Sequence, residues 1–169
     1  MRKLSQAVED RYLIEEVLRQ YCRGVDRGDA ALIRGVYHPD ATDDHGAFKG
    51  LGVDFADRVV AAMAERVAAT MHNLHQINIR FEDVDQPRRA WTESYFTAVH
   101  RVPGEAGGPV LEWFGGRYVD RFERRDGAWK IADRKVVYEW SRIETVAQEY
   151  PNDAFTHGVR GPADVSYQS

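Results

Sequence analysis

The sequence lacks features that mark several common classes of protein. Cys22 is the only cysteine among 169 residues, so an intrachain disulfide is excluded. No apolar run approaches the length that a membrane-spanning helix needs, and the first residues lead into charges rather than into the apolar core of a signal peptide. We therefore expect a cytoplasmic protein that has no membrane partner.

An excess of one charge is also missing. The 23 lysine and arginine residues are interleaved with 27 aspartate and glutamate residues, for a formal net charge of -4. Such a chain has no extended positive electrostatic potential that would attract the phosphates of a nucleic acid, so no nucleic acid partner is expected. It has no Gly-rich phosphate loop, no Cys/His metal spacing and no nucleophile elbow. The expected chemistry uses neither a cofactor nor a metal.

The length and the hydrophobic content of 43% fit one globular domain that can enclose a core and a cavity. We place this domain at residues 1–147. The tail, 148–169, contains Pro151, Gly158, Gly161 and Pro162 and has no clear periodicity. It could be disordered, or it could be an arm laid across the fold or a neighbouring subunit.

The first third of the chain predicts helices. Apolar residues recur at three- and four-residue spacing from Val8 to Val25, which is typical of an amphipathic helix. Gly28 suits the end of this helix, and Asp29 can cap a second helix over 30–36. The sequence His38-Pro39-Asp40 predicts a turn. A loop or short strand through 41–50 and a third helix from about 53 to 69 should follow.

The remainder of the domain predicts strands. Residues 73–82, 89–101, 110–124 and 128–140 are rich in aromatic and β-branched residues. Asp126-Gly127 is a strong hairpin signal between the last two segments. Three helices followed by an antiparallel meander indicate an α+β fold.

Four stretches carry a resemblance to the SnoaL-like branch of the nuclear transport factor 2-like superfamily: Tyr21-Cys22-Arg23-Gly24-Val25-Asp26, His38-Pro39-Asp40-Ala41, Met71-His72-Asn73-Leu74-His75 and Arg124-Arg125-Asp126-Gly127-Ala128-Trp129-Lys130-Ile131. The resemblance spans about residues 8 to 145. It implies a cone-shaped fold in which a curved antiparallel sheet packs against N-terminal helices around a pocket. The chain is similar to the bile acid 7α-dehydratase, scytalone dehydratase and hexachlorocyclohexane dehydrochlorinase members of this superfamily.

The resemblance implies a catalytic dyad of Asp26 and His72, a pocket hydroxyl from Tyr21 and a second catalytic histidine at His100. A carboxylate beside an imidazole fixes the tautomer of the ring and stabilises the imidazolium, which gives a general base near neutral pH. The residues alone leave other interpretations open. Asp26 could be solvated at a helix end, and Tyr21 could be a core residue that follows Val17 by one helical turn.

Two histidines compete for the pocket. Strict alternation along a strand puts His72 and His75 on opposite faces, so only one should enter the pocket unless a bulge intervenes. Family position favours His72. His100 ends a predicted face of small and polar residues that suits a cavity wall, although a final strand residue could equally be solvated. The other members of that face are Ala90, Thr92, Ser94, Phe96 and Ala98.

The expected substrate-binding residues are Arg134, Phe96, Val25 and Trp140. The pocket should be largely apolar, because the residues nearest the proposed dyad include Tyr21, Val25, Phe96 and Trp140. Arg134 shares a predicted strand face with Trp140, and its guanidinium could orient a substrate carboxylate or stabilise an oxyanion. The alternative is a cross-strand pair with an acidic residue.

The segment His38 to His45 superficially resembles a metal-ligand cluster, since imidazole and carboxylate bind several divalent ions. The spacing of His38, Asp40, Asp43, Asp44 and His45 specifies no coordination geometry. A turn rich in hydrogen-bonding side chains is the preferred interpretation. One of the two adjacent aspartates could still face the cavity.

We therefore expect a cofactor-independent lyase, a dehydratase, that acts on a hydroxylated polycyclic or aromatic molecule. His72, oriented by Asp26, would remove a proton next to a carbonyl, while Tyr21 or His100 polarises the carbonyl or protonates the departing hydroxide. An isomerase or cyclase for a steroid- or polyketide-like substrate could use the same base. The superfamily also contains non-catalytic β subunits of ring-hydroxylating dioxygenases and pockets that only bind.

Large aromatic residues are more numerous in the predicted strands than one small cone can bury: Trp91, Tyr95, Trp113, Phe114, Tyr118 and Phe122. A sheet face that helices leave uncovered should be buried in another subunit. We expect a homo-oligomer, with a trimer slightly preferred over a dimer.

Overall fold

The helix predicted from the first apolar stripe is present as α1 (Gln6–Arg27) in the computed structural model, which describes residues 6–83, 85–105, 107–151 and 153–168. It ends as expected, because Gly28 adopts a left-handed φ of 65° that an L side chain would oppose. Asp29 then caps α2 (Ala30–Gly35), and its carboxylate accepts a hydrogen bond from the backbone N–H of Leu32 at 2.9 Å. The third helix is α3 (Gly52–Arg66).

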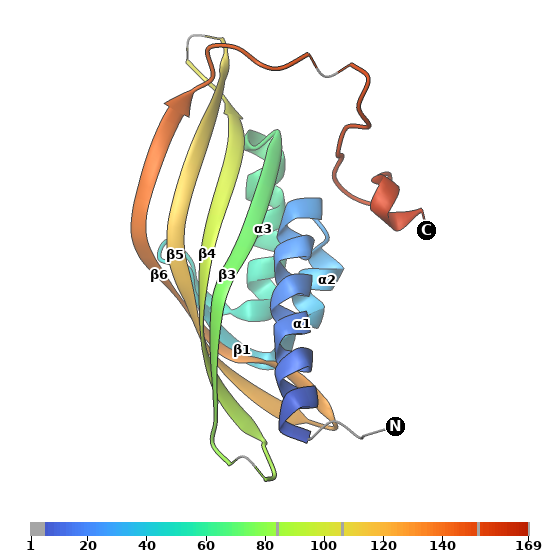
Figure 1. Cartoon of the computed structure of the whole chain (residues 1–169), viewed down its shortest axis with the longest axis vertical. Helices are drawn as coiled ribbons and strands as arrows, with labels where there is room; N and C mark the ends of the chain where they lie inside the picture. The colour runs from blue at the N-terminus through green and yellow to red at the C-terminus, as the bar shows by residue number, and fades with distance from the viewer. Residues whose placement is uncertain (1–5, 84, 106, 152, 169) are drawn as a thin grey trace.

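Six strands form one curved sheet in the order β2-β1-β6-β5-β4-β3. Their bounds are β1 (Tyr37–Asp44), β2 (Lys49–Leu51), β3 (Ala69–Phe81), β4 (Arg89–Pro103), β5 (Pro109–Arg125) and β6 (Ala128–Thr145). The four long strands form the predicted antiparallel meander, whereas β1 pairs in parallel with β6 and makes the sheet mixed. All three helices cover one face of the sheet (Figure 1), which confirms the α+β cone expected from the family resemblance.

The turn predicted at His38-Pro39-Asp40 is wrong, because these residues lie inside β1. The pairing of β1 with β6 shifts register between Tyr37 and Thr42, so Pro39 sits at an irregularity where its missing N–H breaks no regular ladder. The hairpin prediction is confirmed. Asp126 and Gly127 have φ values of 50° and 83°, as a two-residue hairpin turn requires.

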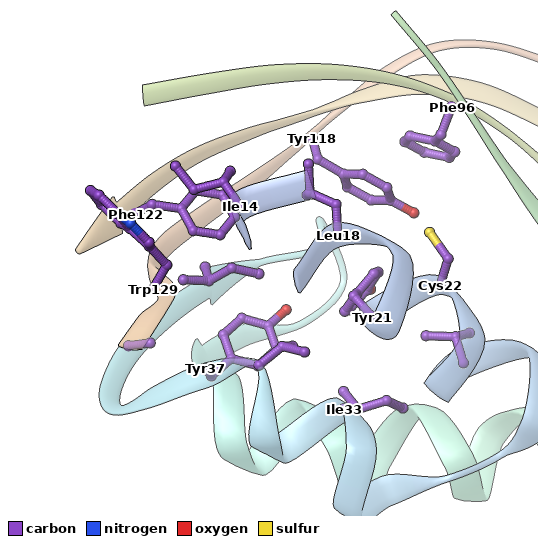
Figure 2. Close-up of a cluster of buried hydrophobic side chains, with 14 of the residues drawn as sticks. Ile14, Leu18, Tyr21, Cys22, Ile33, Tyr37, Phe96, Tyr118, Phe122 and Trp129 are labelled. Atoms are coloured by element: carbon purple, nitrogen blue, oxygen red, sulfur yellow. The ribbon is translucent and has the colours of Figure 1, made fainter. Parts of the chain in front are cut away.

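The core lies between α1 and the concave face of the sheet. Figure 2 shows side chains of α1 pointing at aromatic residues from the strands, with Ile33 of α2 on the other side of the helix. Burial of each large apolar side chain contributes about 1.5–3 kcal/mol, so this contact holds the helix on the sheet. Asp10 is one of several charged side chains that are buried with the core. Asp10 accepts a hydrogen bond from the indole N–H of Trp129 at 2.9 Å and pairs with Arg124 at 3.3 Å.

The tail leaves the end of β6 and returns to the helices as an arm (Figure 1), with one short 3-10 helix, η1 (Val165–Tyr167). Polar contacts hold it at the C-terminal end of α1. Arg27 donates to Asp164 at 2.8 Å, and the Tyr167 hydroxyl donates to Asp29 at 2.9 Å. Within the described parts of the chain, no helix is long and apolar enough to cross a membrane.

Candidate active site

A cavity of about 280 Å³ lies between the sheet and the helices. Most of its lining side chains are apolar, and they come from α1, α3, β4, β5 and β6. Six side chains that line it carry polar groups: Tyr21, His45, His72, His100, Tyr118 and Tyr138. An apolar chamber with a few convergent polar groups is the usual form of a small-molecule site.

The contact between Asp26 and His72 predicted from the sequence is present. The Asp26 carboxylate in the last turn of α1 accepts a hydrogen bond from ring Nδ1 of His72 at 2.7 Å and another from the backbone N–H of His72 at 3.0 Å. The two side chains are 15% and 8% exposed, so solvent competes little for the pair. Because Nδ1 must carry the proton, Nε2 keeps its lone pair, and no other described residue bonds to it.

A bulge in β3 explains which of the two competing histidines faces the cavity. The pairing of β3 with β4 shifts register between Leu74 and Ile77, and this shift returns the apolar residues beyond it to the inner face. His72 lines the cavity, whereas His75 is exposed and its Nε2 bonds to the Thr97 hydroxyl at 2.8 Å. The structure therefore brings His72, and not His75, to Asp26.

His100 lies beside the dyad on β4. Its ring centre is 6.0 Å from that of His72 and 5.0 Å from that of Phe114. Neither ring nitrogen has a hydrogen-bond partner among the described residues. Burial is the main cause that lowers the pKa of His100 to about 4, and the neighbouring His72 and Arg66 side chains lower it further. The ring is therefore neutral at neutral pH and can offer one N–H to a ligand.

Tyr21 combines the two roles that the sequence left open. Its ring is packed in the core, edge-on to Tyr118 at 5.5 Å, with the Arg134 guanidinium 4.1 Å from the ring centre. Its hydroxyl reaches Nε2 of His45 at 3.1 Å at the cavity wall. Burial raises the pKa of Tyr21, so the hydroxyl stays protonated and can donate.

Arg134 does not line the cavity, which corrects its expected role in binding substrate. Its side chain is fully buried and makes two hydrogen bonds to the Asp120 carboxylate, at 2.8 and 2.7 Å. Burial alone lowers the pKa of Arg134, but the Asp120 carboxylate reverses this effect and raises it well above its usual value. Arg134 is thus a permanent cation beneath Tyr21, engaged by an acidic cross-strand partner.

Trp140 does not line the cavity either, so its expected role in binding substrate, which strand alternation had suggested, is corrected. The pairing of β5 with β6 shifts register between Gly115 and Gly116, so Gly115 lies opposite Trp140 and Gly116 lies opposite Tyr138. Tyr138 lines the cavity, whereas Trp140 lines a groove on the outer face of the sheet together with Tyr95. The other two expected substrate-binding residues, Val25 and Phe96, do line the cavity.

Sequence reasoning missed His45 as a cavity residue. Its Nδ1 lies 2.5 Å from a carboxylate oxygen of Asp43, and its ring is stacked on Phe55 with centres 4.1 Å apart. Alternation along β1 from the buried Ala41 would have placed Asp43 and His45 on the inner face, but the turn predicted at Pro39 hid this signal. Among the described residues, no three His, Cys, Asp or Glu side chains gather closely enough to hold a metal ion.

Comparisons with known proteins identify the family and the fold. A SnoaL-like domain model matches residues 6–135. No curated protein sequence matches the chain. Three crystal structures are similar: a scytalone dehydratase-like protein from Novosphingobium aromaticivorans (19% identity, 90% of this chain and 100% of that chain, TM-score 0.71), a type 2 hexachlorocyclohexane dehydrochlorinase (15%, 88% and 97%, 0.72) and a protein from Kribbella flavida (20%, 81% and 95%, 0.71). At these identities the likeness shows the fold alone.

Proposed function

This chain belongs to the SnoaL-like domain family, and we propose that it is a cofactor-independent lyase, a dehydratase that removes water from a hydroxylated polycyclic or aromatic molecule. One observation carries the proposal. The Asp26–His72 pair lines an apolar cavity, and Nε2 of His72 has no bond to any described residue. An oriented neutral imidazole in such a place is suited to remove a proton from carbon.

His72 is the base in the proposed reaction. Its Nε2 takes the proton from the carbon next to a substrate carbonyl, and the Asp26 carboxylate then stabilises the resulting imidazolium. The second hydrogen bond, from the backbone N–H of His72 to Asp26, holds the carboxylate in place while the charge on the ring changes. The orientation of the base is thus independent of the substrate.

His100 binds the carbonyl oxygen in this scheme. Deprotonation next to a carbonyl moves negative charge onto its oxygen, and a hydrogen-bond donor placed there stabilises the transition state. The neutral His100 ring lies beside His72 and has both nitrogens unbonded within the described part of the chain. Its low pKa argues for an N–H donor rather than an imidazolium acid. Tyr21 is left to serve the departing hydroxide.

The character of the cavity supports an apolar ring-containing substrate. Phe55, Phe96 and Phe114 present aromatic surface to the cavity, and Val25 and Val136 add aliphatic surface. Such a lining limits the contact of the base with water and strengthens its electrostatic interactions. The names of two structural neighbours, a scytalone dehydratase-like protein and a dehydrochlorinase, both denote eliminations, which agrees with the proposed class of reaction.

A model substrate can test the base without knowledge of the natural one. The acetate ester of 4-hydroxy-4-phenylbutan-2-one eliminates acetate once its α carbon loses a proton, and acetate leaves without needing a proton. We expect His72→Ala to lower kcat/KM for enone formation by at least ~100-fold, as for loss of a general base. His75→Ala is the matched control, because His75 is exposed on the outer face and should leave the rate unchanged.

Either of two results would contradict the proposal. Enone formation that survives in His72→Ala would show that another group is the base. A wild-type protein that binds the ketone ester in equilibrium dialysis but forms no enone would favour a pocket that only binds its ligand.

We also propose that the protein is a homo-oligomer, a trimer or a dimer, which associates through the outer face of the sheet. Six aromatic residues led to the prediction of an oligomer, and three of them point inward. Phe114, Tyr118 and Phe122 face the cavity or the core. Tyr95 is exposed and Trp91 and Trp113 are half-buried on the outer face, which none of the described helices covers (Figure 1). Light scattering at micromolar concentration should give a mass of more than one chain, and a monodisperse monomer would contradict this.

A further inference from the structure

A second aspartate–histidine pair borders the same cavity. His45 follows β1 and stacks on Phe55 of α3, and its Nδ1 lies 2.5 Å from the Asp43 carboxylate. The Asp43 side chain is fully buried, and its other oxygen accepts the Tyr37 hydroxyl at 2.6 Å. Both carboxylate oxygens therefore have a donor, which satisfies the buried charge.

This arrangement fixes the direction of the His45 ring. Because Asp43 can only accept hydrogen bonds, Nδ1 of His45 must carry a proton. The opposite nitrogen, Nε2, then lies 3.1 Å from the Tyr21 hydroxyl. The result is a chain of contacts from Asp43 through His45 to Tyr21, which ends at the cavity.

The protonation state of His45 decides which way the Tyr21 hydroxyl can donate. A neutral His45 accepts the Tyr21 proton at Nε2, and the phenol has none left for a ligand. A protonated His45 donates Nε2–H to the Tyr21 oxygen, and the phenol can then turn its own O–H to the cavity.

The Tyr21 ring cannot move away from this position. The Arg134 guanidinium lies 4.1 Å from the centre of the Tyr21 ring, and the rings of Tyr118 and Tyr37 meet it edge-on at 5.5 and 6.3 Å. Tyr21 also precedes Asp26 by five residues on α1, a rise of about 7.5 Å along the helix. α1 therefore holds Tyr21, the partner of His45, and Asp26, the partner of His72, at a fixed separation.

We propose that Asp43, His45 and Tyr21 form a proton-delivery relay for the leaving hydroxyl, opposite the base at His72. The inference rests on the proposed function. As the carbon–oxygen bond of the substrate breaks and its electron pair goes to the departing oxygen, Tyr21 gives its phenolic proton to that oxygen, and water forms. Nε2–H of His45 moves to the Tyr21 oxygen and leaves a neutral ring. His72 meanwhile holds the proton taken from carbon, so one proton is gained and one is given up in each elimination.

The relay predicts a dependence on the leaving group that a structural role would not produce. Hydroxide needs a proton to leave, whereas acetate does not. The alcohol 4-hydroxy-4-phenylbutan-2-one and its acetate ester lose a proton from the same carbon and yield the same enone. We expect Asp43→Asn and His45→Gln each to slow elimination from the alcohol by at least ~100-fold, the lower range for acid catalysis, with the ester slowed less than about threefold.

Asp44→Asn is the matched control. It makes the same chemical change one residue away, on a side chain that bonds to Lys49 and to the backbone N–H of Gly46 rather than to His45. The control should leave both rates unchanged. Circular dichroism melting curves identify any variant that fails to fold, and Tyr21→Phe, which keeps the packed ring, then supplies the same selective loss by removing only the hydroxyl.

The outcomes separate this inference from the proposed function. Equal losses with alcohol and ester in the Asp43 and His45 variants, or no loss with either, would overturn the relay. A wild-type protein that eliminates acetate but not hydroxide would overturn it as well. An ester reaction that does not depend on His72, or that is absent in the wild type, would instead overturn the proposed base, and the relay that rests on it.

Discussion

The cavity is bordered by two aspartate–histidine pairs that are built in different ways. Asp26 and His72 lie 46 residues apart in sequence and meet only because α1 packs beside β3. Asp43 and His45 lie two residues apart at the end of one strand. In both pairs the carboxylate holds Nδ1 of the ring. What differs is the partner of Nε2, which is absent among the described residues for His72 and is the Tyr21 hydroxyl for His45.

This comparison indicates that the chemistry of such a pair depends on what the far nitrogen meets. A free Nε2 at an apolar cavity can accept a proton from carbon, whereas an Nε2 joined to a phenol can pass a proton through it. The two pairs also differ in how deeply their surroundings are buried. The Tyr21 ring rests on the fully buried Arg134–Asp120 pair, while the Asp26–His72 pair retains slight solvent exposure.

The largest expected effect concerns the support beneath Tyr21. Arg134→Met leaves the Asp120 carboxylate buried without its partner, and we expect a loss of about 3–5 kcal/mol in the free energy of unfolding, measured with urea. The double variant Arg134→Met/Asp120→Leu removes both charges and should recover most of this loss. A single-variant loss below about 1 kcal/mol would show that the ion pair is not what holds this end of the cavity.

Asp26→Asn should show that the two aspartate–histidine pairs have different roles in elimination. The asparagine amide can donate to Nδ1 of His72, which would move the ring proton to Nε2 and block the base. We expect elimination from the acetate ester to fall by at least ~100-fold. Asp43→Asn provides the comparison at the other pair and should barely change this reaction. Equal losses in the two variants would remove the distinction between base and relay.

His100, which lies beside His72, should make the free energy of unfolding depend on pH. Its pKa is about 4 in the folded protein against 6.5 for the unperturbed group, so the unfolded state binds the proton more readily and stability falls as pH drops from about 6.5 toward 4. At pH 5 this costs about 2 kcal/mol relative to pH 8. His100→Gln should lose that part of the pH dependence in urea unfolding. An unchanged pH profile would contradict the burial of the ring.

Much of the fold could be predicted because it is encoded locally. The stripe of α1, the cap at Asp29 and the hairpin at Asp126-Gly127 each depend on residues near one another in sequence. The pairing of Asp26 with His72 was found through the family resemblance, because a contact across 46 residues leaves no periodic signal. The parallel pairing of β1 with β6 is non-local for the same reason.

Strand irregularity accounts for two of the errors, the turn predicted at Pro39 and the inward direction predicted for Trp140. Alternation holds only while the register is constant, and the shifts in β1, β3 and between β5 and β6 come from cross-strand pairing that a single segment does not contain. The shift opposite Gly115 turned Trp140 outward, and the assumed turn at Pro39 concealed His45. Arg134 was on the correct face, but its partner Asp120 could not be identified without the register.

Exchange of a carbon-bound proton tests the central claim most directly, because it requires a base but no leaving group. The ketone 4-phenylbutan-2-one can be incubated with the protein in deuterated water while proton NMR follows the loss of its α protons. We predict that the wild type and Asp43→Asn exchange these protons at similar rates, whereas His72→Ala exchanges them at the rate of buffer alone. Exchange that persists in His72→Ala, or that disappears in Asp43→Asn, would contradict the division of labour between the two pairs.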